Sequence, residues 1–473
     1  MKNVPALMGV LIGCFAVGAA LPQQLSNNPF PQPIEATRDV ITVNYVEFAK
    51  IPAAADEAPR LMHLVDEPET QRLFVSTMRG MLYSISYDGK AVVPYLDINA
   101  EQWRVSVQFD GFERGLQSFA FHPQFAQTGA PGYGKFYTYT DTTNTAPKAD
   151  FESGSQERTH DTVLLEWTAR NASSPTYDGS APRELFRAAQ PFRNHNGGMI
   201  GFNPLASPNS AEFGLLYVGF ADGGSGGDPL KVAQNLGNAF GKILRIDPLG
   251  SNSRNGKYGI PASNPFVDRT GALDEIFVYG VRNPQRFTWD TKDGRMYLAE
   301  IGQNQVEEVS PVTAGANLGW NLWEGSFRFN SNRQVDLASP RSAPGMTWPV
   351  IEYDHTDPIL LVRAGITGLV IYRVTGPDAI PALANLMIFG DIPSGEIFYV
   401  NADRLPKGGQ ADIRRILFKD KGAAKTLLQL INEHNATQGK PEMPRADLRF
   451  GFDTRGRIYV MNKRDGLIRL LVR

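Results

Sequence analysis

Cysteine is almost missing from this chain, since Cys14 is the only one among 473 residues. The rest of the chain therefore has neither a disulfide nor a thiolate metal site. An excess of charge of one sign is missing too, because the net charge is −2 and the pI is near 6.4. Proteins that bind nucleic acid usually carry a basic face, so we expect no nucleic-acid partner.

Long hydrophobic runs are scarce as well. The apolar run at residues 4–20 is short for a membrane span and has the layout of a secretory signal, with Gly18-Ala19-Ala20 as a small-residue cleavage site. The stretch Leu11-Ile12-Gly13-Cys14 is also similar to a bacterial lipobox, which would place a lipid on Cys14. We therefore expect a signal peptide at residues 1–20 and export to the periplasm or the medium. The lipid would be the only contact with a membrane.

Other familiar signatures are absent. The glycine-dense loop at residues 223–227 is not followed by Lys-Ser or Lys-Thr, so it is not a phosphate-binding P-loop. The histidines show no spacing typical of metal ligands. The chain has 46 glycines and 33 prolines, which makes it rich in turns yet below the roughly 25–30% expected of low-complexity chains. These properties indicate a large globular body.

Short apolar runs, separated by turn residues, recur from residue 39 onward. Most pair an apolar segment with a Gly-x-apolar-aromatic-apolar strand one turn later. Sheets of this kind bury their faces by stacking around an axis. We predict an all-β, six-bladed β-propeller at 39–473, with long rim loops, after a linker at 21–38. The units lie at residues 60–98, 115–167, 192–247, 275–311, 367–400 and 447–473.

Two further segments complete the predicted fold. The strand-like Val40-Ile41-Thr42-Val43-Asn44-Tyr45 is expected to close the ring against the C-terminal strands. Leucine and isoleucine spacing at residues 423–433 predicts one short helical insertion before the last blade.

The stretch from 192 to 247 holds the first candidate site. His195 precedes two glycines, and Asp222 lies in the glycine-dense loop that follows an apolar strand. Neutral imidazole accepts a proton near physiological pH, and a carboxylate commonly orients such a base. From spacing alone a structural interpretation stays open, in which His195 caps a turn and Asp222 begins an Asx-turn.

Two later motifs carry further candidates. Arg282, between an apolar strand and Asn283-Pro284, is well placed to meet an anion, although it is equally suited to pair with a carboxylate of a neighbouring blade. Residues 299–309 combine a glycine turn with nearby carboxylates, a set of oxygen ligands that suits calcium. Solvated glutamates on a loop are the alternative there.

Taken together, these motifs resemble a known family. The series comprises Gly115-Leu-x-Ser-x-Ala-Phe-His-Pro123, His195-x-Gly-Gly198, Gly241-Lys-Ile-Leu-Arg-Ile246, Ile260-Pro-Ala-Ser-Asn-Pro-Phe266, Tyr279-Gly-Val-Arg-Asn-Pro-Gln285, Gly302-Gln-Asn304 with Glu307-Glu308, and Asn317-Leu-Gly-Trp320. It is similar to the soluble glucose/sorbosone dehydrogenases. These are six-bladed propellers that use pyrroloquinoline quinone (PQQ) and calcium to oxidise aldose sugars. The resemblance spans roughly residues 61–473.

The resemblance implies roles for the candidates. His195 would take the proton of the sugar C1 hydroxyl while a hydride passes to the quinone, which yields the lactone. Asp222 would steer His195 and touch the sugar. Arg282 would face the quinone oxygens, with Asn283 beside it.

It also implies how the cofactors would be held. Backbone carbonyls of Gly302 and Gln303 would bind calcium, and Arg449 would pair with a carboxylate of PQQ. Glu113 falls where a glutamine stands in the glucose-oxidising members, and Gln303 where they have proline. Their clamp lysine has no counterpart in residues 389–395, and their paired arginines of the last blade reduce to Arg449.

Two functions follow from this comparison. One is an exported PQQ sugar dehydrogenase that passes electrons to an external acceptor. The other is a non-catalytic propeller that binds a protein or glycan, since the propeller of hedgehog-interacting proteins shares several of these motifs. The presence of His195, Asp222 and Arg282 favours the enzyme, and the missing lysine favours the binding protein.

Overall fold

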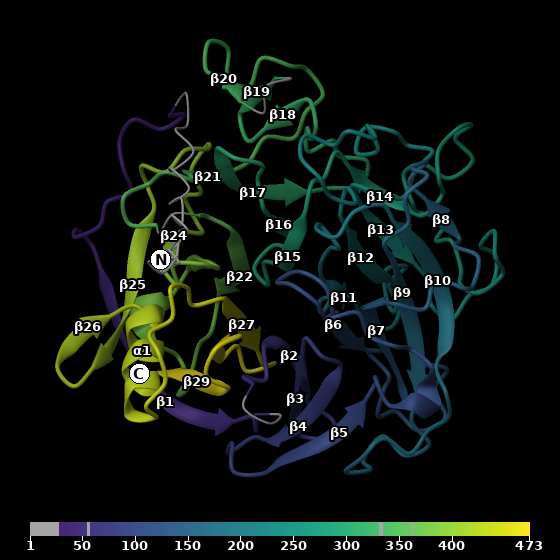
Figure 1. Cartoon of the computed structure of the whole chain (residues 1–473), viewed down its shortest axis with the longest axis horizontal. Coiled ribbons are helices and arrows are strands. Elements are labelled where there is room, and N and C mark those ends of the chain that lie inside the picture. The colour runs from purple at the N-terminus through teal and green to yellow at the C-terminus, as the bar shows by residue number, and fades with distance from the viewer. Residues whose placement is uncertain (1–27, 54–56, 331–333, 361–362) are drawn as a thin grey trace, which may run out of the picture.

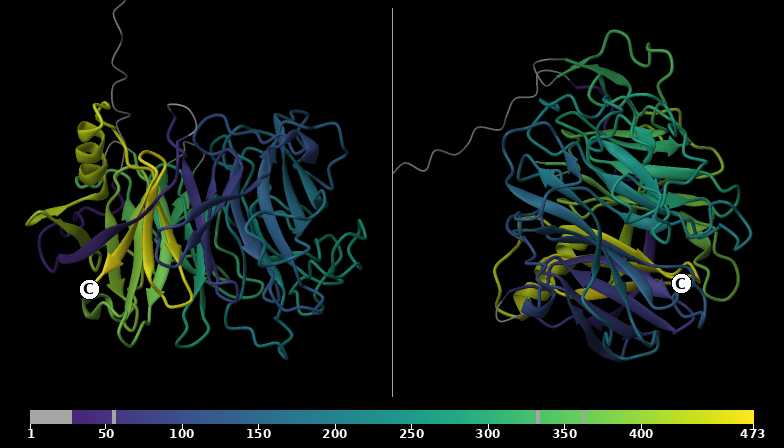
Figure 2. Two further views of the ribbon diagram at one scale, coloured as in Figure 1. Left: turned by 90° about the horizontal axis from the view of Figure 1, so that it is seen from below. Right: turned by 90° about the vertical axis from the view of Figure 1, so that its right-hand side faces the viewer.

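The computed structural model describes residues 28–53, 57–330, 334–360 and 363–473. The chain is mostly β, and its sheets follow one another around a common centre in chain order (Figure 1). Seen edge-on, the strands cross the thickness of this ring, and loops project from both of its faces (Figure 2). The predicted signal peptide, Cys14 and the first part of the linker lie outside the described residues.

Three sheets occupy the middle of the chain. Their strands are antiparallel neighbours apart from β8, which runs parallel to β10. The first contains β6 (Leu116–Phe121), β7 (Lys135–Thr142), β8 (Phe151–Glu152), β9 (His160–Thr168) and β10 (Arg183–Gln190). The second contains β11 (Ile200–Phe202), β12 (Leu216–Phe220), β13 (Lys242–Ile246) and β14 (Ile276–Tyr279). The third contains β15 (Pro284–Trp289), β16 (Met296–Glu300), β17 (Val306–Val312) and β21 (Ile351–Asp354).

The remaining long strands form one 13-stranded sheet. One group in this sheet contains β2 (Leu61–Glu67), β3 (Arg72–Thr77), β4 (Met81–Ser86) and β5 (Val92–Asp97). A second group contains β22 (Ile366–Tyr372), β23 (Leu386–Asp391), β24 (Ile397–Asn401), β25 (Arg414–Asp420) and β26 (Ala423–Lys425). Between these two groups lie β1 (Ile41–Lys50), β27 (Leu448–Phe452), β28 (Ile458–Asn462) and β29 (Leu467–Val472). Short elements complete the described chain: β18 (Trp323–Glu324), β19 (Phe327–Phe329), β20 (Val335–Asp336), and the 3₁₀ turns Glu101–Trp103 and Pro381–Leu383.

Strand β1 closes the ring, as the sequence predicted. Its first half pairs with β25 in parallel, with Ile41 opposite Ile416, and its second half pairs antiparallel with β29. The strand thus lies between the two neighbouring groups and covers an edge of each. Because this pairing fuses three groups into one sheet, the predicted number of six blades stays a prediction.

Two details differ from the sequence prediction. The segment at 276–279 pairs with β13 and so completes the preceding sheet instead of opening the next unit. The helix begins later than predicted: α1 is Leu427–Thr437, and residues 423–425 form β26 against β25. Thr426 explains the boundary because its side chain accepts the Gln429 N–H while the Gln429 side chain accepts the Thr426 N–H, a capping box.

Large aromatic side chains fill the space between adjacent sheets. One cluster combines Tyr137 and Tyr139 of β7 with Phe220 of β12, and all three side chains are fully buried. Each sheet face is buried by its neighbour, which is why the strands read as nearly continuous apolar runs. The core therefore runs around the ring, and its loops are free to carry the site.

The described part of the predicted linker packs on this body. Ile34 is buried and donates its N–H to Asp357 Oδ2 at 2.7 Å. The Phe30 ring packs on Phe327 at 5.5 Å. No helix in the described ranges is long and apolar enough to cross a membrane.

Candidate functional site

The candidate residues follow alternate strands of neighbouring sheets. Strands β12 and β14 run in the same direction, because each is antiparallel to β13. Strand β16 is antiparallel to β15, so it ends where β15 begins, next to the end of β14. The loops that carry Asp222, Arg282 and Gly302 therefore emerge at one end of the ring, which places their side chains within reach of one another.

His195 meets both of its predicted partners. Its Nδ1 lies 2.7 Å from Asp222 Oδ1, and its Nε2 lies 3.0 Å from Arg282 Nη2. The imidazole is only 5% exposed, and its backbone has a φ of 55°, which turns the side chain inward from the loop after β10. The three residues that the sequence singled out form one buried chain of hydrogen bonds.

The partners fix the tautomer of neutral His195. A guanidinium donates hydrogen bonds and accepts none, so Nε2 must be the acceptor and the proton must lie on Nδ1. That proton points at Asp222, and the Nε2 lone pair is the position at which this residue accepts a proton. The arrangement is that of a general base oriented by a carboxylate.

Asp222 is held by donors on both oxygens. Its Oδ1 also accepts the Gly224 N–H at 3.0 Å, and its Oδ2 accepts the Trp320 Nε1–H at 2.9 Å. Burial by itself raises the pKa of this carboxyl, but the nearby charge and hydrogen bond of His195 and the charge of Arg282 outweigh burial, so the pKa lies below its usual value. Asp222 is therefore ionised at neutral pH.

Arg282 is oriented by the loop that follows β16. Its Nη1 donates to the Ile301 carbonyl at 2.9 Å, and its Nε and Nη2 donate to Gln303 Oε1 at 3.3 and 3.2 Å. The guanidinium lies 5.4 Å from the centre of the Trp320 ring. The Arg282 backbone N–H donates to Glu300, a buried carboxyl at the end of β16. No carboxylate side chain pairs with this guanidinium among the described residues.

Asn283 and Glu113 lie beside this chain in different ways. Asn283 is 7% exposed, and its carbonyl accepts the Ile301 N–H at 3.2 Å. Glu113 is exposed, but its Oε2 accepts the backbone N–H of His195 at 2.7 Å. Glu113 therefore supports the left-handed backbone of His195, a contact that its position in the sequence did not reveal.

The loop at Gly302 and Gln303 has a fixed shape. A Cβ on Gly302 would overlap the Val306 carbonyl, so only glycine fits there. Glu324 Oε1 accepts four consecutive backbone N–H groups, those of residues 303–306, at 2.8 to 3.1 Å. Among the described residues no group of three or more His, Cys, Asp or Glu is arranged to hold a metal. Any cation at this loop would therefore depend on the backbone carbonyls.

Arg449, in β27, is 4% exposed and lacks an ion pair in the described structure. Its Nη1 donates to the Leu448 carbonyl at 2.7 Å, whereas its buried Nε has no hydrogen-bond partner. Burial lowers the pKa of this guanidinium to about 10. An unsatisfied buried cation is the property expected of a site for an anionic ligand.

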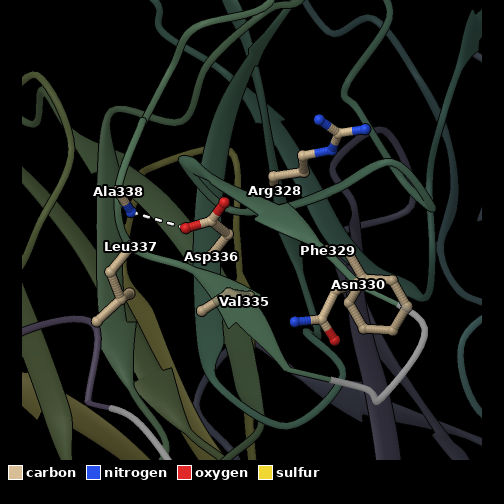
Figure 3. A pocket seen from close by; sticks show the side chains of 7 residues that line it. All are labelled: Arg328, Phe329, Asn330, Val335, Asp336, Leu337 and Ala338. Carbon is tan, nitrogen blue, oxygen red and sulfur yellow. Dashed lines mark hydrogen bonds between the residues drawn. The ribbon is translucent and has the colours of Figure 1, made fainter.

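The rim loop at residues 327–342 reaches the site through Phe329. Its ring lies 4.8 Å from the Trp320 ring, and a Cβ on Gly227 in the Asp222 loop would come within 3.3 Å of it. Figure 3 shows the shallow hollow on this rim, where Asp336 Oδ1 accepts the Ala338 N–H at 2.9 Å. None of the predicted site residues lines that hollow.

Lys242, the first residue of β13, stabilises the segment that follows Asp222 by hydrogen bonds to its backbone. Its fully buried Nζ donates to the carbonyls of Val232, Ala233 and Phe240 at 2.8, 3.1 and 2.6 Å. Burial lowers the pKa of Lys242 to about 7, against the usual 10.5 expected in the unfolded chain. The unfolded chain therefore binds more protons between these pH values, so folding is favoured as the pH rises.

We accordingly expect a pH-dependent difference between the natural protein and Lys242→Met. The difference in the free energy of unfolding should be flat below pH 7 and rise between pH 7 and 10.5, by up to about 1.4 kcal/mol per pH unit. Urea titrations across this range measure it. Lys419→Met, at an exposed lysine of β25, is the control and should leave the pH slope unchanged. A constant difference for Lys242→Met would contradict the lowered pKa.

Sequence reasoning missed several contributors to the site. Trp320 lies within the motif Asn317-Leu-Gly-Trp320, but nothing in the spacing of that motif indicates that Trp320 contacts Asp222 and Arg282. Glu324 gave no signal, because its role depends on a hydrogen bond to a loop 20 residues away. Asn196 follows His195 and donates to His160 Nε2 at 2.8 Å, which anchors the loop to β9.

Comparison with known proteins shows which protein family the chain is related to. A family model described as "Glucose / Sorbosone dehydrogenase" matches residues 57–423. The chain is 31% identical over 373 residues to the HIPL1 protein of Arabidopsis thaliana, covering 70% of this chain and 51% of that protein. It is 25% identical over 219 residues to the aldose sugar dehydrogenase YliI of Escherichia coli, covering 46% and 51%.

Human Hedgehog-interacting protein is also similar, at 31% identity over 228 residues, 47% of this chain and 29% of that protein. The chain thus spans about half, or less, of the length of these curated relatives. The PQQ-bound aldose sugar dehydrogenase of Streptomyces coelicolor shares the fold, with a TM-score of 0.56 and 18% identity over 89% of this chain and 97% of that one. The family model covers most of the chain, and the chain belongs to the glucose/sorbosone dehydrogenase family.

Proposed function

We propose that this protein is a PQQ-dependent aldose sugar dehydrogenase built on a six-bladed β-propeller. The observation that carries the proposal is the buried chain Asp222–His195–Arg282, which presents an oriented base beside a guanidinium. A protein that only binds a partner has little need of an ionised carboxylate buried behind an imidazole. Family membership and the similarity to sugar dehydrogenases support the same conclusion.

The residues present fit PQQ, which bears three carboxylates. Arg449 is a buried cation with a free donor, and Arg282 has no carboxylate partner in the described structure, so both suit a flat anion. When bound, PQQ supplies the two-electron acceptor of the reaction. Arg282 would face its quinone oxygens and stabilise negative charge there, with Asn283 alongside.

In the proposed reaction the sugar loses a hydride from C1 and a proton from the C1 hydroxyl, which leaves the lactone. His195 Nε2 takes the proton, once the sugar hydroxyl replaces or shares its contact with Arg282. Asp222 then stabilises the imidazolium across the 2.7 Å hydrogen bond. The two electrons finally pass to an external acceptor.

Calcium is proposed at the backbone carbonyls of Gly302 and Gln303. Calcium prefers oxygen ligands and accepts backbone carbonyls. Support comes from the rigid loop, in which Glu324 binds the N–H groups of residues 303–306 and leaves the carbonyls as the remaining polar groups of the backbone. The charge of the cation would polarise the cofactor next to Arg282.

The substrate class is a small-molecule aldose. We assign the choice among aldoses to the rim loops at residues 144–157 and 327–342, since the second loop contacts Trp320 through Phe329. We also propose that the protein is exported, to the periplasm or the medium, with Cys14 lipidation as the alternative to cleavage after Ala20. The mass of the mature N-terminal peptide distinguishes these two routes.

The alternative function is a non-catalytic propeller that binds a protein or glycan. The similarity to Hedgehog-interacting protein and the HIPL1 protein favours it. In that case the buried chain at His195 would be structural.

A direct test adds PQQ and calcium to the purified protein and follows dye reduction across a panel of aldoses. We expect a cofactor-dependent absorbance spectrum and sugar-dependent turnover that is lost when a chelator removes calcium. Protein without added PQQ is the control. Absence of both the spectrum and turnover with every sugar would reject the enzyme in favour of the binding protein.

A further inference from the structure

The run at residues 389–395, where the family resemblance implies a clamp lysine, contains no lysine and holds a structural carboxylate in this chain. Asp391 is 0% exposed and accepts the N–H of Ser394 at 2.9 Å and its hydroxyl at 2.6 Å. It also accepts the Gly365 N–H at 2.8 Å. These donors tie β23 to the loop before β22, so this run cannot supply a cation to an anionic ligand.

Another lysine, Lys463, is buried at the end of β28. It is 4% exposed, and its Nζ donates to the Phe112 carbonyl at 2.7 Å and contacts Met78 Sδ at 3.5 Å. Within the described residues it has no ion pair. An ammonium carries three donors, so a sulfur and one carbonyl satisfy it poorly.

Lys463 belongs to a cluster of cations that are partly or fully buried. Arg449 and Arg60 are electrostatic neighbours of Lys463, and Arg286 is a neighbour of Arg449. All three arginines lack ion pairs in the part of the chain that the structure describes. Arg286 donates only to the carbonyls of Gln285 and Met62, at 2.7 and 2.9 Å. Asp447, the carboxylate between them, is already paired with Arg445 at 2.6 Å and Arg464 at 2.5 Å.

Basic groups outnumber carboxylates in this cluster. The basic side chains are Arg60, Arg286, Arg445, Arg449, Lys463 and Arg464, and the neighbouring carboxylates are Asp110, Glu113 and Asp447. Burial, and then the neighbouring charge of Arg449, lowers the pKa of Lys463 well below its usual value. Like charges held together out of water favour an anion between them.

The cluster adjoins the candidate site through one residue. Glu113 lies within the electrostatic reach of both Lys463 and Arg449, and its Oε2 binds the backbone N–H of His195 at 2.7 Å. The Phe112 carbonyl that Lys463 contacts belongs to the residue just before Glu113. An anion held by Lys463 and Arg449 would therefore lie beside the His195 loop.

We propose that Lys463, directly after β28, binds a carboxylate of PQQ and takes over the role of the clamp lysine that residues 389–395 lack. The inference rests on the proposed function, since it names a further residue for the same cofactor. The excess of basic groups in the cluster suits an anionic ligand, and Lys463 and Arg449 both interact electrostatically with Glu113.

The test measures the dissociation constant for PQQ by titrating the purified, calcium-loaded protein and following the absorbance of the quinone. Lys463→Met is expected to weaken PQQ binding roughly ten- to hundredfold, the effect of one charge-assisted contact. Lys463→Arg should stay within about threefold of the natural protein, because it retains the charge that pairs with a carboxylate. Lys135→Gln, at a lysine paired with Glu166 on another sheet, is the matched control and should bind normally.

A second ligand separates charge recognition from shape. The trimethyl ester of PQQ should bind the natural protein and Lys463→Met equally, because it presents no carboxylates. Unfolding temperatures show whether each variant folds. If all variants bind PQQ as the natural protein does, the assignment of Lys463 is wrong while the proposed function stands. If the natural protein itself does not bind PQQ, both are wrong.

Discussion

Replacement of His195 by alanine is expected to lower sugar-dependent turnover by roughly 10²- to 10⁴-fold, the usual contribution of a general base. The structure orients the imidazole of His195, with Nδ1 facing Asp222 and the Nε2 lone pair facing Arg282. The dissociation constant for PQQ should change little, because His195 does not belong to the cationic cluster. Turnover is measured with PQQ and calcium at saturation, and PQQ binding by its absorbance.

A matched variant separates loss of the base from general damage. His434→Ala changes a histidine on α1, at the outer side of the ring, and should leave both turnover and PQQ binding at the level of the natural protein (Figure 1). Full turnover in His195→Ala would mean that the proton is taken elsewhere. Loss of PQQ binding in the same variant would show that His195 acts mainly as a structural or cofactor-binding residue.

The recurring strands and the pairing of His195 with Asp222 were accessible to sequence reasoning because both depend on local patterns. Apolar runs bounded by turn residues indicate strands, and glycine loops after strands carry sites. Family resemblance then indicated which loops converge. The same reasoning placed the closing strand correctly, since β1 has no partner within its own part of the chain.

The missed residues act across long separations in the chain. Trp320 contacts Asp222 from 98 residues away, and Lys463 meets Phe112 from 351 residues away. The local sequence indicates neither contact, because a tryptophan or a lysine after a strand is compatible with many environments. Only the closure of the ring brings β28 beside the loop before β6.

The start of the helix shows a different limit. Ala423, Ala424 and Lys425 are good helix formers, so propensity alone extends the helix to residue 423. In the structure these residues pair with β25, and Thr426 caps the helix that follows. Pairing with a neighbouring strand overrides local preference here, and the Thr426–Gln429 capping box was the local signal that marked the true boundary.

Replacement of Asp222 by asparagine is the second change with a large expected effect, a fall in turnover on the order of 10²- to 10⁴-fold. Proton transfer turns His195 into an imidazolium, and the buried carboxylate stabilises this charge strongly because little solvent screens it. Asparagine supplies no charge. It also has one acceptor oxygen where Asp222 serves three donors, those of His195, Gly224 and Trp320.

The double variant Asp222→Asn with Trp320→Phe separates these two causes. Phenylalanine removes the indole N–H but keeps an aromatic ring beside Arg282. The asparagine oxygen can then face His195 and Gly224, because its NH2 group no longer meets the N–H of Trp320. If the carboxylate acts through its charge, as we expect, turnover in the double variant stays close to that of Asp222→Asn. Trp320→Phe alone should cost less than tenfold. Recovery to the level of Trp320→Phe would instead show that orientation of the imidazole suffices and that the charge on Asp222 contributes little to the proton transfer.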